Sequence, residues 1–223
     1  MQVFLAVCTG LGLAAACGLR VFLPLFIVAI AVKAEWISPP DAFDWIGETP
    51  ALVVFGVASV IEISGFMFPW VDHALDVIAV PLSAVAGAVL MTMPLLAVAT
   101  GDNALIHPAV AWSLGIVAGV ATASGVEAAS IAGRLSSSVL TIGWLNPIYA
   151  VIETVLAFLL VVMSIMVPML AGILVMLLLP VLLIAVWRIL VWRRKLRLAQ
   201  QEKLRKARER IAASMAHRAA AGA

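Results

Sequence analysis

Apolar residues follow one another in long runs along this chain, and short polar stretches separate the runs. The runs cover residues 2–33, 51–70, 77–99, 109–133 and 148–192. About 20 apolar residues in a helix cross the hydrocarbon core of a bilayer, which is roughly 30 Å thick. The pattern therefore predicts a polytopic membrane protein built from helices.

Two of these runs are too long for a single crossing. As one helix, residues 2–33 would span ~48 Å and residues 148–192 ~68 Å. We expect the first run to break at Gly18-Leu19-Arg20, with Pro24 following, either as two short helices or as one interrupted, partly re-entrant helix. The second run must turn back near Pro168 to Gly172. The fold class expected is an all-α transmembrane bundle of six to seven segments, at least one of them interrupted or re-entrant.

The polar stretches predict which side of the membrane each connection faces. Residues 34–50 carry four acidic residues, no basic residue and two tryptophans, which suits the outer interface, and residues 101–108 form a second outer loop. A short interfacial turn at Asp72 to Asp76 and the stretch 136–147 are expected on the cytoplasmic side. Prolines at positions 81 and 94 are expected to interrupt the crossing at residues 77–99.

Composition supports a membrane protein and excludes a soluble catalyst. The 223 residues are 65% hydrophobic and only 12% charged, with a mean hydropathy of +1.17, so a soluble domain would lack a polar surface. The chain contains none of the phosphate-loop, nucleophile-elbow, zinc-helix or dinucleotide fingerprints of soluble enzymes. We expect no cofactor, and an enzyme is the less favoured class.

Charge is distributed unevenly along the chain. Residues 1–187 carry three basic and ten acidic residues, a net charge of −7, whereas residues 188–223 carry eleven basic and two acidic residues, a net charge of +9. The positive-inside rule then predicts a cytoplasmic C-terminus. We expect a transmembrane domain at 1–192 and a basic tail at 193–223, helical and then disordered, with anionic lipids rather than nucleic acid as its partner.

Small residues recur at helical spacing in two places. Gly10, Ala14 and Gly18 are four residues apart, as are Gly115 and Gly119, which favours close helix contact. Either stripe would serve packing within one chain or contact in a homo-oligomer.

Two glutamates fall inside the apolar runs, at Glu62 and Glu153. A carboxylate at such a depth costs ~2.5–3.5 kcal/mol on insertion scales, so it faces a bundle interior or a watery cavity. One interpretation is a proton-linked group in a transporter, with Glu62 the stronger candidate. The alternative is a structural glutamate bonded to Arg20, to Arg134 or to a backbone amide at a broken helix.

Arg20 and Arg134 lie in similar contexts, Gly18-Leu19-Arg20 and Ala132-Gly133-Arg134, a faint repeat of the kind that transporters use to build paired half-sites. Their guanidinium groups suit an anionic substrate or lipid phosphate, while ordinary positive-inside placement explains them equally. Glu127 precedes Arg134 by seven residues, on one helix face but too far for direct contact without a third group, so an internal network is expected.

A third candidate cluster consists of Asp72, His73 and Asp76. Two carboxylates at this spacing share a helix face and suit a hard cation, whereas an N-cap aspartate in a solvated interfacial turn explains them more simply. A single histidine with no second histidine or cysteine nearby argues against zinc, and we expect no metal.

Taken together, these motifs resemble those of a known family. The opening GLAAACGLRVFLPL, the set Glu62, Pro69, Asp72, His73 and Asp76, and the later Gly-Arg, Asn-Pro and Glu run resemble an uncharacterised bacterial membrane family, domain of unknown function 4126. The resemblance covers most of residues 5–190. It implies a small polytopic inner-membrane protein and no established activity.

Three functions are compatible with these features. The first is a small transporter, permease or lipid flippase in which Glu62 is the proton- or ion-linked group and the two arginines bind an anion. The second is an intramembrane enzyme that acts on lipid phosphates through Asp72, His73 and Asp76. The third is a non-catalytic membrane scaffold whose tail recruits partners.

Overall fold

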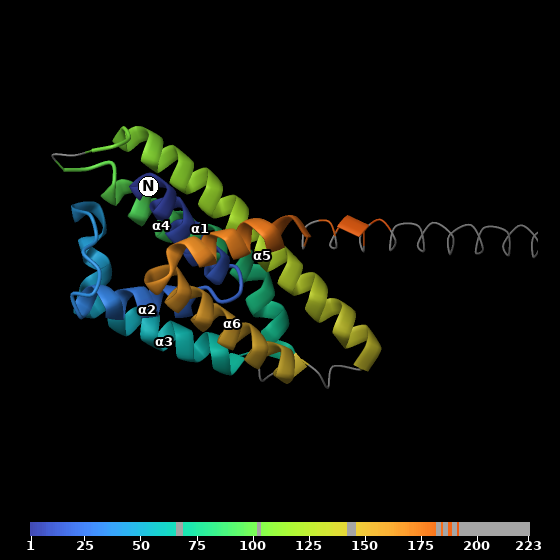
Figure 1. The fold of residues 1–223 in the computed structure, drawn as a ribbon. Helices are drawn as coiled ribbons and strands as arrows, with labels where there is room; N and C mark the ends of the chain where they lie inside the picture. Colours follow the sequence, from blue (N-terminus) through green and yellow to red (C-terminus); the bar gives the residue numbers. More distant parts are fainter. Residues whose placement is uncertain are drawn as a thin grey trace, which may run out of the picture. The chain divides into compact units, whose positions relative to one another are not determined.

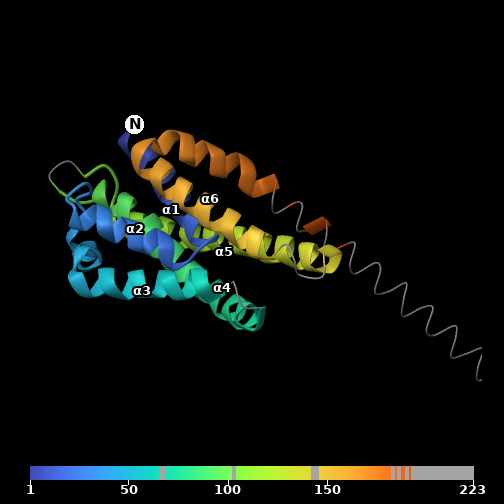
Figure 2. The same ribbon diagram turned by 90° about the horizontal axis from the view of Figure 1, so that it is seen from below.

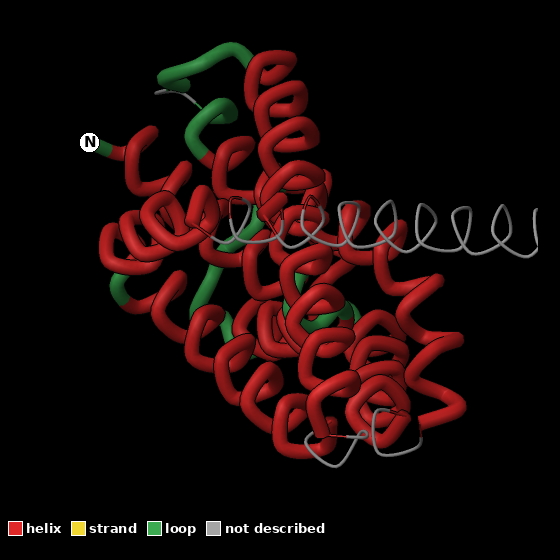
Figure 3. Tube along the Cα trace, turned by 90° about the vertical axis from the view of Figure 1, so that its right-hand side faces the viewer, coloured by secondary structure: helices red, strands yellow, loops and turns green. Residues whose placement is uncertain are grey.

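The computed structural model is all-α in the part of the chain that it describes. It describes residues 1–65, 69–101, 104–141, 146–181, 184, 187, 188 and 191, and these contain helices and loops but no strand (Figure 3). The chain divides into two compact units, Met1–Leu183 and Ile184–Ala223. All the helices described below belong to the first unit. The expected basic tail at 193–223 lies outside the described residues.

The helices are named in chain order. They are α1 (Gln2–Cys17), α2 (Phe22–Lys33), the 3-10 helix η1 (Asp41–Gly47), α3 (Thr49–Gly65), α4 (Pro69–Ala97), α5 (Pro108–Thr141), α6 (Asn146–Met166) and a final apolar helix, Pro168–Val181.

Three stretches of helix in the described residues are long and apolar enough to cross a membrane: Ile78–Ala97, Pro108–Arg134 and Ile148–Met166. A fourth crossing results if η1 and α3, which meet at a bend of 60°, count as one span. Helices α1, α2 and Pro168–Val181 are apolar but shorter than a crossing. The several apolar helices indicate a membrane protein, but the six to seven segments expected from the sequence are not confirmed.

The first apolar run breaks where the sequence predicts. Helix α1 ends at Cys17 and α2 begins at Phe22, with Pro24 in its first turn, where a proline removes no helical hydrogen bond. Residues from both outer ends of this pair, Gln2 at the start of α1 and Ile37 after α2, line one cavity of about 350 Å³. The two helices therefore form a hairpin, and its turn is buried inside the bundle.

Helix α1 is the central helix of the bundle (Figures 1 and 2), and its small residues allow the other helices to approach closely. Gly10 lies against Met91 of α4, Gly12 against Ser164 of α6, and Gly18 against the Ala123 carbonyl of α5. A side chain at any of these three glycines would collide with its neighbour. The stripe at Gly10, Ala14 and Gly18 thus serves packing within one chain.

The second stripe acts in the same way between α4 and α5. Gly119 lies against the backbone of Gly87, and Gly115 lies against Thr92. Because neither glycine presents a side chain, the two helix backbones come into direct contact, as at small-residue crossings in other membrane bundles.

Two helix boundaries and the interior of one helix differ from the sequence predictions. Helix α4 begins at Pro69, so Asp72 to Asp76 belong to its first turns rather than to a separate interfacial turn, since proline suits the first position of a helix. Pro81 and Pro94 lie inside a continuous helix, as neighbouring groups in membrane bundles tolerate. Helix α5 continues to Thr141 and includes the serines at 136–138, which were expected in a loop.

The two loops predicted on the outer side do lie together. Ser38 to Ala42 and the segment around Gly101 line one cavity of about 650 Å³. Phe43 of η1 also stacks on Trp112 of α5, with ring centroids 5.6 Å apart. These contacts join the acidic connection and the α4–α5 loop at one end of the bundle.

Candidate functional site: a buried network of arginines and glutamates

Arg20 occupies the turn between α1 and α2 and is 1% exposed. Its Nη2 donates a hydrogen bond of 2.7 Å to the Ala150 carbonyl of α6, and its Nε donates one of 3.0 Å to Thr154 Oγ1. The Thr154 hydroxyl in turn donates to the same carbonyl at 2.8 Å. Two uncharged groups of α6 therefore position this guanidinium.

Glu153 lies between two arginines that come from different parts of the chain. Its Oε2 is 3.8 Å from Arg20 Nη2, and its Oε1 is 3.8 Å from Arg134 Nε. Ser130 of α5 donates a hydrogen bond to the same Oε1. The carboxylate is 3% exposed, so its charge is balanced by the protein rather than by water.

Arg134 also pairs with Glu127 on its own helix, with Arg134 Nη2 3.7 Å from Glu127 Oε1. The prediction that these residues are too far apart for direct contact was wrong. A helical side chain leans toward the N-terminus of its helix, and an arginine is long enough to reach back over two turns. The internal network expected for Glu127 and Arg134 is confirmed, with Glu153 as a further member.

The two arginines are not in equivalent backbone settings, although their sequence contexts look alike. Arg20 lies at a helix break, whereas Arg134 lies inside the continuous helix α5. Both side chains are buried in the bundle and reach the same carboxylate. Neither is at the surface position that positive-inside placement alone would give.

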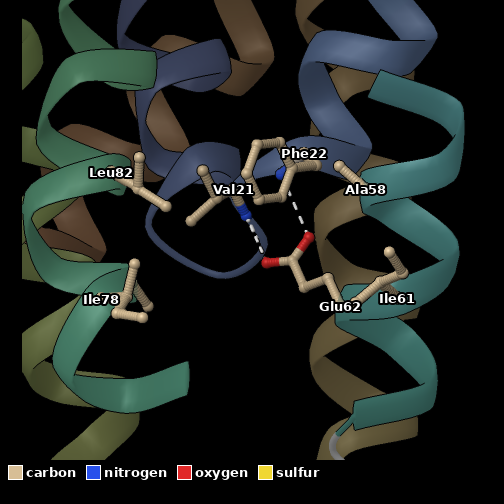
Figure 4. Close-up of a pocket in the computed structure, with 8 residues that line it drawn as sticks. Val21, Phe22, Ala58, Ile61, Glu62, Ile78 and Leu82 are labelled. Carbon is tan, nitrogen blue, oxygen red and sulfur yellow. Dashed lines mark hydrogen bonds between the residues drawn. The ribbon is translucent and has the colours of Figure 1, made fainter. Parts of the chain in front are cut away.

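Glu62 has a different set of partners. Its Oε1 accepts a hydrogen bond of 2.7 Å from the Val21 N–H, and its Oε2 accepts one of 3.0 Å from the Phe22 N–H (Figure 4). Helix α2 has no side-chain cap of its own at Val21. The Glu62 carboxylate therefore supplies the acceptors for the first N–H groups of α2, and it faces the positive end of the helix dipole. This matches the structural alternative for Glu62, a glutamate bonded to backbone amides at a broken helix.

A small cavity of about 140 Å³ adjoins Glu62, between α3 and α4. Apart from Glu62 its wall consists of uncharged residues, among them Ile61, Ile78 and Leu82, which surround the carboxylate in Figure 4. Glu62 itself is 7% exposed. The cavity is thus an apolar recess beside a capped helix end.

Asp72, His73 and Asp76 lie in the first turns of α4, apart in sequence from the network. The positions of their side chains lie outside what the structure describes. Among the described residues, no group of three or more histidine, cysteine, aspartate or glutamate side chains could hold a metal ion.

Sequence reasoning missed Ser130 and Thr154. Ser130 lies three residues after Glu127 and four before Arg134, so a helical projection of α5 places all three on one face and could have found it. The role of Thr154 depends on Arg20, 134 positions away, and no local pattern signals it.

The network combines two guanidinium groups, Arg20 and Arg134, with two carboxylates, Glu127 and Glu153. Their formal charges cancel, which is the arrangement that a low-dielectric interior tolerates. All four residues are at most 5% exposed. Such a site is able to hold charge inside a membrane domain.

Comparison with known proteins identifies the chain by family alone. No curated protein and no solved structure matches it. A family model described as a domain of unknown function (DUF4126) matches residues 7–188, which include every member of the network and Glu62. The chain therefore belongs to the family of domain of unknown function 4126.

Proposed function

We propose that this protein is a small permease that moves an anionic solute, or an anionic lipid headgroup, together with a proton. Glu153 takes up the proton, and Arg20 and Arg134 hold the anion. The observation that carries the proposal is the position of Glu153, buried between two arginines from separate elements, one of which lies in the turn between α1 and α2.

The cost of the network supports a role beyond packing. Buried ion pairs are commonly no more stabilising than well-packed apolar residues of similar volume, because desolvation offsets much of the Coulomb attraction. Ionisable residues inside membrane segments are rare for the same reason and mark ion or substrate pathways. Many transporters build their sites at an interrupted helix, and Arg20 of this network lies at the break between α1 and α2.

Within the proposal, Glu62 has a supporting role. The sequence pattern favoured Glu62 as the proton-linked group, but its carboxylate oxygens accept hydrogen bonds from two backbone amides of α2. Glu153 instead contacts the two groups that would bind an anion. The proton-linked role therefore passes to Glu153, and Glu62 holds the turn in position.

The proposal also includes the location and orientation expected from charge. The protein resides in a bacterial inner membrane, its C-terminus faces the cytoplasm, and the basic tail 193–223 contacts anionic lipid. Truncation after residue 192 should then reduce the salt-sensitive binding of the purified protein to phosphatidylglycerol vesicles, relative to phosphatidylcholine vesicles.

Reconstitution tests the transport proposal. Liposomes that contain the protein and an internal pH dye receive methanesulfonate, nitrate, sulfate or phosphate outside under an inward proton gradient. In parallel, fluorescent phosphatidylglycerol reports headgroup movement. We expect protein-dependent acidification with at least one anion, or protein-dependent lipid scrambling, and a loss of at least tenfold in Glu153→Gln.

The control for this experiment is Glu48→Gln, which removes an exposed carboxylate just before α3, far along that helix from Glu62. It should retain the wild-type rate. Folding of each variant is checked by its elution as a single species in detergent. Unchanged flux in a folded Glu153→Gln, or no protein-dependent flux of any probe, would overturn the proposal.

A further inference from the structure

We infer that two adjoining cavities at one end of the bundle form a single binding site for an amphiphile with one alkyl chain and a primary ammonium head. The first is the cavity of about 350 Å³ between α1, α4 and α6, which we call the deep cavity. The second is the cavity of about 650 Å³ beside the two loops, which we call the wide cavity. The four residues of the arginine–glutamate network line neither cavity, and the inference does not depend on the proposed permease.

The two cavities adjoin each other, and together they lead from the surface to the interior. Three residues line both cavities: Ser38, Pro40 and Ala97. The wide cavity is bordered by Asp41, which is exposed, and by Trp112, which is 41% exposed. The deep cavity reaches Leu13 and Ser164, which are at most 1% exposed. Each volume falls within the roughly 300–1,000 Å³ of small-molecule sites, so one ligand is able to occupy both.

The deep cavity suits an alkyl chain. Most of its wall is apolar, with Leu5 and Ile165 among the side chains that line it. Two hydroxyls also line it, and each donates its hydrogen to a carbonyl of its own helix. Thr9 donates to the Leu5 carbonyl at 2.9 Å, and Ser164 donates to the Leu160 carbonyl at 2.6 Å. An apolar chain therefore leaves neither hydroxyl hydrogen without an acceptor.

The wide cavity suits an ammonium head. Asp41 lines it and forms no ion pair with any residue that the structure describes. Thr100 also lines it and donates its hydrogen to the Leu96 carbonyl at 2.9 Å, so its oxygen has only lone pairs left, which accept from an N–H group. Trp112, which stacks on Phe43, adds an aromatic ring, and such rings attract organic cations.

The charges near the wide cavity also favour a cation over an anion. The two connections, 34–50 and 101–108, carry five acidic residues and neither lysine nor arginine. The basic groups nearest to this region along the chain are Lys33, His107 and the amino group of Met1. Because the acidic groups outnumber them, an ammonium head is attracted to this end of the bundle and an anionic head is repelled.

Binding of defined amphiphiles tests the inference. The purified full-length protein is placed in phosphatidylcholine nanodiscs, and equilibrium dialysis at neutral pH measures bound radiolabelled decylammonium after subtraction of binding to empty nanodiscs. Its amine stays protonated at this pH, as a lysine side chain does. We expect saturable binding of one decylammonium per protein. Decanesulfonate and decanol, which have the same chain with an anionic or a neutral head, should compete at least about tenfold more weakly.

One pair of variants tests the position of the head. Asp41→Asn should weaken decylammonium binding by about threefold or more, since it removes the carboxylate that lines the wide cavity. The matched control is Glu48→Gln, which also removes one exposed negative charge but lies seven residues further on, about 14 Å along a 3-10 helix. In about 150 mM salt, charges are screened beyond about 8 Å, so this control should bind nearly as the wild type does.

A second pair of variants tests the position of the chain. Ala97→Phe places a ring where the two cavities meet and should weaken binding at least about tenfold. Ala109→Phe, the same change at an exposed alanine of α5 that lines neither cavity, should bind as the wild type does. Folding of each variant is checked by its elution as a single species, and the comparison of head groups on the wild-type protein needs no variant.

Several results would overturn the inference. Equal competition by all three head groups would mean a groove that selects only an apolar chain, and a preference for decanesulfonate would mean a site for anions. Binding that does not saturate, an unchanged affinity in Asp41→Asn, or an Ala97→Phe variant that binds like Ala109→Phe would also contradict it. The assay contains no gradient, so none of these results bears on the permease, which is tested by flux in liposomes.

Discussion

At the scale of single residues, Glu62 and Glu153 show how partners give two buried glutamates different properties. The carboxylate of Glu62 accepts hydrogen bonds from the backbone at the start of α2, so it acts as the cap that this helix lacks. The carboxylate of Glu153 faces two guanidiniums and a serine hydroxyl. The first arrangement fixes the backbone, whereas the second brings together charged side chains from three different parts of the chain.

A prediction about stability follows for Glu62. In Glu62→Ala the amides of Val21 and Phe22 lose their acceptor in a buried site, and each unsatisfied amide costs about 1–3 kcal/mol. We expect unfolding in denaturing detergent to become easier by about 2 kcal/mol or more. Glu62→Gln keeps one acceptor oxygen and should lose roughly half as much.

The control for this prediction is Val60→Ala, a truncation of a 65% exposed side chain on the same helix, which should change the unfolding free energy little. If Glu62→Ala were as stable as Val60→Ala, the hydrogen bonds from Val21 and Phe22 would not hold the turn.

The sequence alone was sufficient to select these glutamates but not to assign their partners. An acidic residue within an apolar run is a local signal, and so are Arg20 and Arg134. The partners are distant along the chain: Val21 is 41 positions from Glu62, and Thr154 is 134 positions from Arg20. Only the packing of the helices brings them together, and no spacing rule in a single sequence encodes that packing.

At the scale of secondary structure elements, helix breaks and small residues were more predictable than helix ends. The glycine and the following proline marked the α1–α2 break because both act on the local backbone. The prolines of α4 misled, because surrounding helices in a membrane bundle tolerate an interior proline that would break an isolated helix. The serines in α5 misled similarly, since polarity indicated a loop where the helix continues.

The contact between α4 and α5 gives a prediction at this scale. In Gly119→Ala, the new methyl group would collide with the backbone of Gly87, and backbone atoms have no alternative rotamer into which to move. Overpacking of this kind costs about 1–3 kcal/mol, so the melting temperature in detergent should fall. Val117→Ala, two residues away and 69% exposed, is the matched control and should melt near the wild-type temperature. An unchanged melting temperature for Gly119→Ala would show that the two helices separate at little cost.

At the scale of the whole molecule, the number of crossings was the least predictable property. Length and hydropathy show that a run is apolar, but they do not distinguish a helix that crosses from two short helices that enter and return. Helices α1 and α2, with 16 and 12 residues, span about 24 and 18 Å, each less than a bilayer core of about 30 Å. The turn between them is buried among the other helices, and this burial brings Arg20 to Glu153.

The buried turn between α1 and α2 predicts a pattern of labelling by a membrane-impermeant thiol reagent. In a variant with Cys8 and Cys17 replaced by alanine, single cysteines at Gln2 and Trp36 should react from the same side of oriented vesicles, because both ends of the pair lie at one end of the bundle. A cysteine at Leu19 should react from neither side, since Leu19 lines an apolar recess with Leu156 and Leu174. If α1 and α2 each crossed the membrane fully, the turn would reach the opposite surface and Leu19→Cys would react there. Reaction of Gln2→Cys and Trp36→Cys from opposite sides would instead mean that α1 and α2 together cross the membrane once. Either this result or reaction of Leu19→Cys would show that the turn is not buried, and the arginine–glutamate site depends on that buried turn.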